Sequence, residues 1–261
     1  MLRAPCYVFS DTHLGFAPAD VERQLREFLR SLAGRAGSLV INGDLFEFWF
    51  EWRHVMPRAA FRVLAELANL RDAGVPVLMV AGNHDCWGGE ILRRDAGLDY
   101  QVGPWSGELA GWRAMIEHGD GLRDREDRRY RWLRAVLRNG LAIRAFRWIH
   151  PDLATPLAGG SSHASRSYAA RDGGRGLRNV AERRLAAASE TELLIFGHSH
   201  VAALERTRSG GVYANAGSWL DAPTYLRVSP ERVELRRWDG SAEGVLLHAL
   251  DRGAQKALAH G

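Results

Sequence analysis

Two histidines separated by one residue occur in the stretch Gly197-His198-Ser199-His200. This stretch directly follows the apolar run 193–196, which predicts a short buried strand. Imidazole nitrogens are common metal ligands, and a pair at the end of a strand can face one small volume. Such a pair is equally typical of ordinary surface or core histidines. Its role therefore depends on whether other segments bring ligands to the same place.

Four further predicted strands also end in polar side chains of the kinds that bind metals. The runs 6–9, 38–42, 75–81 and 112–117 are apolar and β-prone. In that order, they are followed by Asp11 and His13, by Asp44, by Asn83-His84-Asp85, and by His118 and Asp120. Carboxylate, amide and imidazole ligands together suit Zn, Mn or Fe, whereas Mg and Ca prefer oxygen alone. The number of ligands fits two metals that share a bridging carboxylate.

Helical and strand patterns around these clusters predict an α/β fold. Residues 19–32 and 57–73 have apolar side chains at helical spacing, and a short helix at 89–95 precedes a less regular stretch. In open α/β sheets the ligand crevice lies outside the carboxyl ends of the strands, so the five clusters can share one site. Short β-prone runs predict an antiparallel or mixed closing half at 202–207, 212–215, 224–228, 233–238 and 245–250.

The segment 122–190 differs from the rest of the chain in charge and pattern. It contains 15 arginines and 7 acidic residues, a net charge of +8 in a chain whose formal net charge is +4. Within it, residues 125–141 place Trp132 and leucines on one face and arginines on the other. We predict a single domain over residues 1–261 with a basic, amphipathic helical insertion at about 122–190. A packed structural subdomain with a solvated arginine face is the alternative.

The composition argues against several classes of protein. No apolar stretch approaches the roughly 20 residues of a transmembrane helix, and the residues before the first predicted strand are too few for a signal peptide. The cysteines, Cys6 and Cys86, make no disulfide framework, so we expect a reducing compartment, the cytoplasm. The positive net charge is mild evidence for an anionic partner, although the arginine bias is also typical of GC-rich coding.

The ordered motifs resemble those of the calcineurin-like metallophosphoesterases over most of the chain. They are Asp11-x-His13, Gly43-Asp44, Gly82-Asn83-His84-Asp85, His118 and Gly197-His198-Ser199-His200. The resemblance implies a β-sandwich of two mixed sheets flanked by helices. It implies that one metal is held by Asp11, His13 and His200, that the other is held by Asn83, His118 and His198, and that Asp44 bridges them. His84 would lie on the substrate side, where it would steady the phosphoryl charge or assist the leaving group.

A dinuclear site of this kind predicts a metal-dependent phosphohydrolase. Two metals about 3.5–4 Å apart can clamp the attacking and leaving oxygens of an in-line displacement at phosphorus. Coordination lowers the pKa of water by several units, so hydroxide is available near neutral pH without a serine or cysteine nucleophile. We expect two divalent ions, Mn²⁺ first and Fe or Zn as alternatives, with Asp44 and His84 as the catalytic residues.

Two stretches resemble, more narrowly, the UDP-2,3-diacylglucosamine hydrolases of lipid A synthesis. They are Gly43-Asp44-Leu45-Phe46-Glu47-x-Trp49 and His118-Gly119-Asp120-x-Leu122, the latter followed by Asp127, Tyr130 and Arg134. The resemblance implies a nucleotide-lipid substrate that is cleaved to UMP and 2,3-diacylglucosamine 1-phosphate, with the insertion as a lid over the acyl chains. It implies substrate contacts at His84, Asp127, Tyr130, Ser165, Arg166 and His198.

One departure and several alternatives bear on the substrate. His84 stands where the best-known hydrolases of this group carry arginine, which places the chain in a divergent branch of the group or outside it. A basic amphipathic insertion also suggests an anionic membrane surface as partner, on the cytoplasmic face of the inner membrane, and no nucleic acid is expected. The alternatives are a nucleotide or dinucleotide polyphosphate phosphatase, a nuclease, and a non-catalytic binding protein that has kept the fold.

Overall fold

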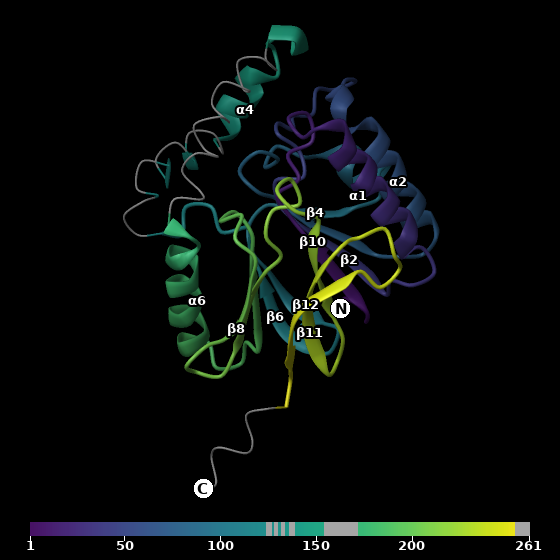
Figure 1. Ribbon diagram of the computed structural model, residues 1–261. Coiled ribbons are helices and arrows are strands. Elements are labelled where there is room, and N and C mark those ends of the chain that lie inside the picture. Colours follow the sequence, from purple (N-terminus) through teal and green to yellow (C-terminus); the bar gives the residue numbers. More distant parts are fainter. Residues whose placement is uncertain (124–126, 128–129, 132–133, 136–138, 154–171, 254–261) are drawn as a thin grey trace, which may run out of the picture.

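Two β-sheets pack against each other, and helices cover their outer faces (Figure 1). The computed structural model describes residues 1–123, 127, 130–131, 134–135, 139–153 and 172–253. Within these residues the predicted architecture, two mixed sheets flanked by helices, is confirmed. No helix of this described part is long and apolar enough to cross a bilayer.

The larger sheet has seven strands in the order β12-β11-β10-β1-β2-β3-β4. Its first half is parallel and consists of β1 (Cys6–Phe9), β2 (Ser38–Asn42), β3 (Val77–Val80) and β4 (Asp99–Gln101). Its second half is antiparallel and consists of β10 (Thr224–Val228), β11 (Arg232–Arg237) and β12 (Val245–Asp251). Strands β1, β2 and β3 are buried along their whole length, which explains why each reads as a continuous apolar run.

The smaller sheet has five strands in the order β5-β6-β7-β9-β8. They are β5 (Trp105–Leu109), β6 (Trp112–Ile116), β7 (Leu193–Phe196), β8 (Ala203–Arg206) and β9 (Val212–Asn215). Strands β6, β7 and β9 are parallel, and the two outer strands are antiparallel to their neighbours. The predicted mixed closing half is therefore confirmed.

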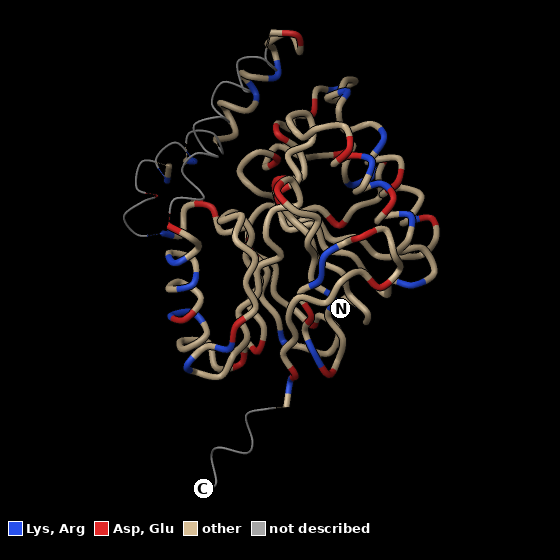
Figure 2. The backbone as a smooth tube through the Cα atoms, in the orientation of Figure 1, with Lys and Arg blue, Asp and Glu red and all other residues tan. Residues whose placement is uncertain are grey.

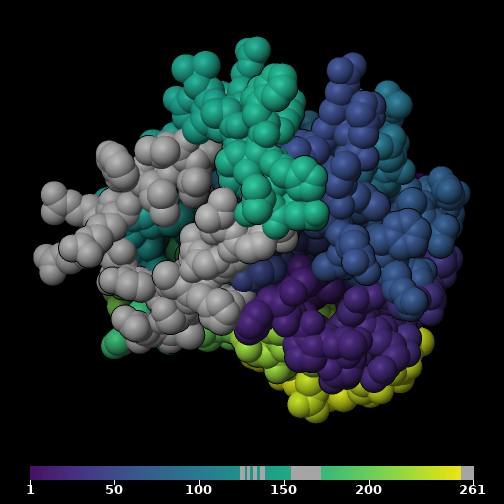
Figure 3. Space-filling model, turned by 90° about the horizontal axis from the view of Figure 1, so that it is seen from above, coloured from purple at the N-terminus to yellow at the C-terminus, as the bar shows by residue number. Residues whose placement is uncertain are grey.

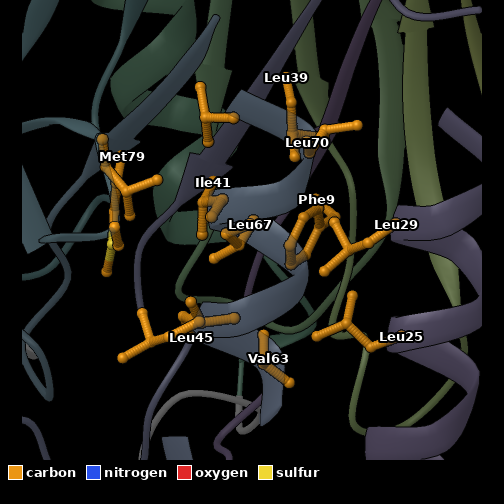
Figure 4. Close-up of a cluster of buried hydrophobic side chains, with 14 of the residues drawn as sticks. Phe9, Leu25, Leu29, Leu39, Ile41, Leu45, Val63, Leu67, Leu70 and Met79 are labelled. Atoms are coloured by element: carbon orange, nitrogen blue, oxygen red, sulfur yellow. The ribbon is translucent and has the colours of Figure 1, made fainter. Parts of the chain in front are cut away.

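Helices α1 (Ala19–Leu32) and α2 (Phe61–Asp72) cover the larger sheet. A 3-10 turn, η1 (Arg58–Ala60), leads into α2, so the α-helix begins four residues after the predicted start at Pro57. Figure 4 shows apolar side chains of both helices packed against β1, β2 and β3. Each fully buried leucine or phenylalanine of this layer contributes about 1.5–3 kcal/mol relative to an exposed one.

Helix α6 (Arg175–Ala187) covers the smaller sheet. Its buried residues Leu177, Val180 and Leu185 pack in one cluster with Leu194 and Phe196 of β7. This helix belongs to the segment 122–190 and forms a layer of the sandwich. Helix α4 (Gly140–Phe146), also within that segment, lies apart from both sheets (Figure 1). The extent of the predicted insertion remains a prediction.

The less regular stretch contains two strands that were not predicted, β4 and β5. Strand β4 has only three residues, and Ser106, Gly107 and Glu108 of β5 are exposed, so neither strand shows an apolar pattern. The short helix predicted at 89–95 is a π-helix, η2 (Ile91–Asp95).

Candidate active site

The carboxyl ends of β1, β2 and β3 in one sheet and of β6 and β7 in the other meet at the same end of the sandwich. The side chains that follow these strands are in direct contact across the two sheets. Nε2 of His118, after β6, lies 3.1 Å from Oδ2 of Asp44, after β2, and 4.0 Å from Oδ1 of Asp11, after β1. The predicted convergence of five strand ends on one place is thus observed.

A first group of possible metal ligands comprises Asp11, His13 and His200, whose ligand atoms all lie within 4.8 Å of one another. Nε2 of His200 is 3.4 Å from Oδ1 of Asp11 and 3.4 Å from Nε2 of His13. Asp11 and His13 are buried and His200 is nearly so. Three ligands that belong to opposite sheets therefore surround one point.

A second group comprises Asp44, His118 and His198, and a third comprises His13, Asp44 and His84. Within each of these groups, too, the ligand atoms lie within 4.8 Å of one another. Asp44 and His13 each belong to two of the groups, and of these two only Asp44 is a carboxylate, the kind of side chain that can bridge two metals. Asn83 lies in the loop after β3, next to His84, whose backbone N–H donates to Oδ1 of Asp44 at 2.9 Å. The structure thus brings all seven predicted ligands to the same end of the two sheets.

Five of these side chains are carried by unusual backbone. Asp11, His13, Asp44, His198 and His200 have φ between 52° and 59°. Of the non-glycine residues that the structure describes, Ala110 alone shares this left-handed conformation. Positive φ is unfavourable for residues with a Cβ, and strain of this kind clusters at functional sites. The fold holds these side chains in place against the preference of their own backbone.

Two motif glycines are required because site side chains lie against their backbone. A Cβ atom at Gly82 would lie 2.1 Å from Oδ1 of Asp44. Gly43 has a φ of 81°, and a Cβ there would lie 2.3 Å from Nδ1 of His118. The Gly-Asp and Gly-Asn-His-Asp spacings in the sequence therefore reflect close packing inside the site.

Backbone carbonyls orient two of the histidines. Nδ1 of His118 lies 2.8 Å from the carbonyl oxygen of Asn42, and Nδ1 of His84 lies 2.8 Å from that of Glu47. A protonated Nδ1 that donates to a carbonyl leaves Nε2 as the atom facing the site. For His84 this atom is 3.9 Å from Oδ2 of Asp44.

The electrostatics favour a cationic occupant. Burial opposes charge on Asp44, but His118 and His84 hold the pKa of its carboxyl well below the usual range. Burial also opposes protonation of His200, yet its contacts with Asp11 and Asp221 raise its pKa to about 10. Burial and the neighbouring His118 lower the pKa of His198 to about 4. Anionic carboxylates surrounded by imidazoles are the donor set of a transition-metal site.

Two buried atoms give a direct test of whether a metal fits. Oδ1 of Asp11 and Nε2 of His118 make no hydrogen bond of normal geometry within the described residues. Buried polar atoms are normally satisfied, so such atoms call for a ligand. Both are donor atoms with lone pairs that a divalent cation binds. The residues present therefore fit the metals that the sequence predicts.

Asp85 connects two loops of the site by accepting backbone hydrogen bonds. Its Oδ1 accepts a hydrogen bond from the N–H of Gly82 at 2.7 Å, and its Oδ2 accepts one from the N–H of Leu45 at 2.8 Å. These bonds join the loops after β3 and β2. Burial, together with the nearby Asp44, raises the pKa of this carboxyl to about 7.

Two carboxylates near the site were not predicted from the sequence. Oε2 of Glu47 lies 3.1 Å from Nδ1 of His13, and Oδ2 of Asp221 lies 3.3 Å from Nδ1 of His200. Glu47 belongs to the Gly-Asp-Leu-Phe-Glu stretch, which predicted the class of substrate but no role for Glu47 itself. Asp221 follows no motif, and no local pattern marks it.

The predicted ligands and His84 together form the strand-end cluster (Asp11, His13, Asp44, Asn83, His84, His118, His198 and His200), and the predicted substrate residues Asp127 and Tyr130 lie in the segment that follows Asp120 beside it. The buried carboxylate of Asp127 accepts hydrogen bonds from the backbone and guanidinium of Arg123 at 2.8–3.1 Å. The hydroxyl of Tyr130 donates to Oδ2 of Asp120 at 2.9 Å. Their contact with substrate stays a prediction. Ser165 and Arg166 lie outside the described residues.

An aromatic surface adjoins the site through Trp87, three residues after His84. It is built from Phe48, Phe50, Trp52 and Trp87, and α4 and the residues after it cover it with Ile143, Phe146 and Ile149. The ring centroids of Phe146 and Phe50 are 4.9 Å apart, and Nε1 of Trp52 donates to the carbonyl of Ile149 at 3.1 Å. Figure 3 shows the α4 segment lying against the segment around residue 50.

Comparisons with known proteins agree with this site. A model of the family Calcineurin-like phosphoesterase matches residues 4–202, which include every predicted ligand. The UDP-2,3-diacylglucosamine hydrolase of Porphyromonas gingivalis is 30% identical over 245 residues, covering 86% of this chain and 94% of that protein. The hydrolase of the same name from Stenotrophomonas maltophilia is 31% identical over 237 residues, covering 84% and 92%.

Among solved structures, a dimetal phosphatase from Danio rerio is similar, with a TM-score of 0.48 and 14% identity over 94% of this chain and 97% of that one. The sequence match over 199 of 261 positions and the ligands gathered at the strand ends lead to the same conclusion. The chain belongs to the calcineurin-like phosphoesterase family.

Proposed function

We propose that the protein hydrolyses UDP-2,3-diacylglucosamine to UMP and 2,3-diacylglucosamine 1-phosphate. The observation that carries the proposal is the similarity to hydrolases of that name over 84–86% of this chain, which extends well beyond the short metal motifs. The similarity also covers 92–94% of the length of those hydrolases. The aromatic surface beside the cluster, with α4 over it, supports an apolar substrate moiety.

The proposed ligand sets are supported by the groups around Asp11 and around His118, to which Asn83 is added from the resemblance. Asp11, His13 and His200 would hold one divalent ion, Asn83, His118 and His198 would hold the other, and Asp44 would be the carboxylate that both share. When bound, the two ions would supply Lewis acidity and a water molecule of lowered pKa. The mixed nitrogen and oxygen donors favour Mn²⁺, with Fe or Zn as alternatives. Metal analysis of the protein as isolated distinguishes these ions.

His84 is the proposed catalytic group on the substrate side. Its Nδ1 is held by the carbonyl of Glu47, which leaves Nε2, 3.9 Å from Oδ2 of Asp44, as the atom that would meet a phosphate bound at the site. A protonated Nε2 can neutralise charge on the phosphoryl oxygens and donate its proton to the leaving-group oxygen as the bond from phosphorus to the bridging oxygen breaks. Arginine at this position would offer charge without a transferable proton.

The segment around α4 is the proposed lid over the acyl chains. Ile143, Phe146 and Ile149 pack in one apolar cluster with Phe48 and Trp87. Acyl chains can pack against the same side chains. Asp127, Tyr130, Ser165, Arg166 and His198 are the proposed further substrate contacts. Burial of acyl methylenes contributes about 0.8 kcal/mol each, which is ample for selecting a lipid.

An anionic membrane surface is the proposed partner, on the cytoplasmic face of the inner membrane. Leu141 of α4 (77%) and Trp148, two residues beyond its end (91%), are exposed. Arg144 and Arg147 lie in the same segment, and Figure 2 shows basic residues along it. Exposed apolar side chains among arginines are typical of helices that bind at a lipid interface.

The direct test is incubation with UDP-2,3-diacylglucosamine and Mn²⁺, with the products identified by mass spectrometry. We expect UMP and the lipid monophosphate in equal amounts. A second candidate, a nucleotide or dinucleotide polyphosphate phosphatase, is favoured by His84 in place of arginine. Rapid hydrolysis of dinucleotide polyphosphates beside an inert lipid substrate would select that candidate.

A further inference from the structure

The histidines of the first group are backed by carboxylates. His13 directs Nδ1 toward the side chain of Glu47 at 3.1 Å, and His200 directs Nδ1 toward that of Asp221 at 3.3 Å. Both histidines thereby turn Nε2 toward Asp11 and toward each other. A carboxylate behind a ligating imidazole fixes its tautomer, orients the ring and raises its basicity.

The second group is backed differently. Nδ1 of His118 meets a backbone carbonyl, that of Asn42, at 2.8 Å. A carbonyl orients the ring equally well but carries no net charge. Two carboxylates therefore contact the Nδ1 atoms behind the first group, whereas Nδ1 of His118 contacts an uncharged carbonyl, and the acid near the second group, Asp120, is paired with Arg134 at 3.6 Å. For a divalent cation, this difference favours the first group.

Backbone hydrogen bonds hold both carboxylates close to the histidines that they contact. Asp221 follows a loop that is bound to the loop after β1, because the N–H of Leu220 and the hydroxyl of Ser218 each donate to the carbonyl of Asp11 at 3.2 Å. Glu47 is fixed by its own N–H, which donates to the carbonyl of Leu14 at 2.9 Å. Each carboxylate is thus anchored to the chain segment that carries Asp11 and His13.

We propose that Glu47 and Asp221 are positioning residues that make the Asp11–His13–His200 site the tighter of two divalent-cation sites. The proposal rests on the dinuclear site of the proposed function, but not on the identity of its substrate. Loss of such a carboxylate typically weakens metal binding about 10–100-fold. The effect should be confined to one of the two ions.

The test is equilibrium dialysis of metal-stripped protein against Mn²⁺, with bound metal measured by elemental analysis. For the wild type we expect two equivalents with distinct Kd values. Glu47→Gln and Asp221→Asn should each weaken the tighter equivalent about 10-fold and leave the weaker one unchanged. Asp221→Glu, which keeps a carboxylate on an exposed loop, should restore most of the lost affinity.

Matched controls separate this role from stability. Glu51→Gln removes a buried carboxylate that accepts from Trp49 and Ile91 and touches none of the ligand histidines, and Asp239→Asn removes an exposed loop carboxylate. Both should keep two wild-type Kd values. In an Asn83→Ala background, which lacks a ligand of the second site, Glu47→Gln should still weaken the remaining equivalent.

Unchanged Kd values in both Glu47→Gln and Asp221→Asn would overturn the proposal, as would equal weakening of both equivalents. Circular dichroism and the Tm of the metal-free variants identify any variant that has lost its fold. If Glu47→Gln is such a variant, the Kd values of Asp221→Asn, on an exposed loop, test the proposal alone. A wild-type protein that binds no Mn²⁺ would contradict the proposed function itself. A wild type with two equivalents but no lipid hydrolysis would contradict only the substrate.

Discussion

The strand-end cluster and the surface around α4 are built in opposite ways. The cluster joins loops after five strands of two sheets, buries its carboxylates and holds five side chains on left-handed backbone. The α4 segment is a short helix whose described contacts with the rest of the chain are apolar, apart from the bond between Trp52 and Ile149, and which leaves Trp148 exposed. The first can change little without losing its geometry. The α4 segment can change in sequence while the catalytic side chains stay in place. This fits a division between residues that catalyse and residues that select the substrate.

The largest effect is expected at Asp44, the centre of the cluster. Asp44→Ala should lower kcat/KM at least about 10³-fold on every substrate, because several kcal/mol of transition-state stabilisation depend on the bridged metals. Elemental analysis should show that bound metal is lost together with activity. Asp95→Ala, at an exposed carboxylate far along the chain, is the control. Full metal content in the Asp44 variant would contradict the bridging role.

The next largest effect is expected at His84, which lies in the cluster but is not assigned as a ligand. His84→Ala should lower kcat about 10²–10⁴-fold, the usual contribution of a general acid, and should retain both metals. Metal content and turnover are measured on the same sample. Loss of metal in this variant would show that His84 is itself a ligand.

The aromatic surface should affect lipid substrates alone. Phe146→Ala removes the ring that packs on Phe50 and Trp87, and we expect about a 10-fold lower kcat/KM for UDP-2,3-diacylglucosamine, equivalent to about 1.4 kcal/mol. Hydrolysis of bis(p-nitrophenyl) phosphate should be unchanged. Phe61→Ala, at an exposed phenylalanine on α2, is the matched control. Equal losses on both substrates would indicate that α4 supports the fold and does not select lipid.

The smallest effect is expected at the exposed side of α4. Trp148→Ala should reduce flotation of the protein with vesicles containing phosphatidylglycerol a few-fold, because one interfacial tryptophan is lost. Binding should also weaken with salt, since arginines near the surface contribute about 1 kcal/mol each. Val102→Ala, at an exposed residue after β4, serves as the control. Flotation that is unaffected by either salt or Trp148→Ala would argue against this side of α4 as the membrane contact.

The sequence predicted the strand-end cluster well because each ligand directly follows a buried apolar run. Strands β1 and β2 and helix α1 have the predicted boundaries, because both strands are continuous buried apolar runs and the buried residues of α1 recur at helical spacing. The role of Glu47 depends on a contact with a residue 34 positions away, and Asp221 reaches His200 through a loop that only the tertiary fold closes. No local pattern contains that information.

The limits of prediction are also clear in the segment 122–190. An amphipathic pattern indicates that a helix has an apolar face but not what covers it. Helix α6 presents Leu177 and Leu185 to the smaller sheet, whereas α4 presents Phe146 to an aromatic loop. Helix α6 carries several arginines outside its apolar face and α4 carries Arg144, so charge did not separate them either. Strands β4 and β5 were missed because their exposed residues give no apolar alternation.

The most direct test of the division between chemistry and substrate choice is the ratio of kcat/KM for UDP-2,3-diacylglucosamine to that for UDP-N-acetylglucosamine, which has the same diphosphate but no long acyl chains. We predict a ratio of at least about 100, because burial of even four acyl methylenes contributes about 3 kcal/mol. A ratio near one, with both substrates hydrolysed, would contradict a lipid-selecting surface beside the cluster.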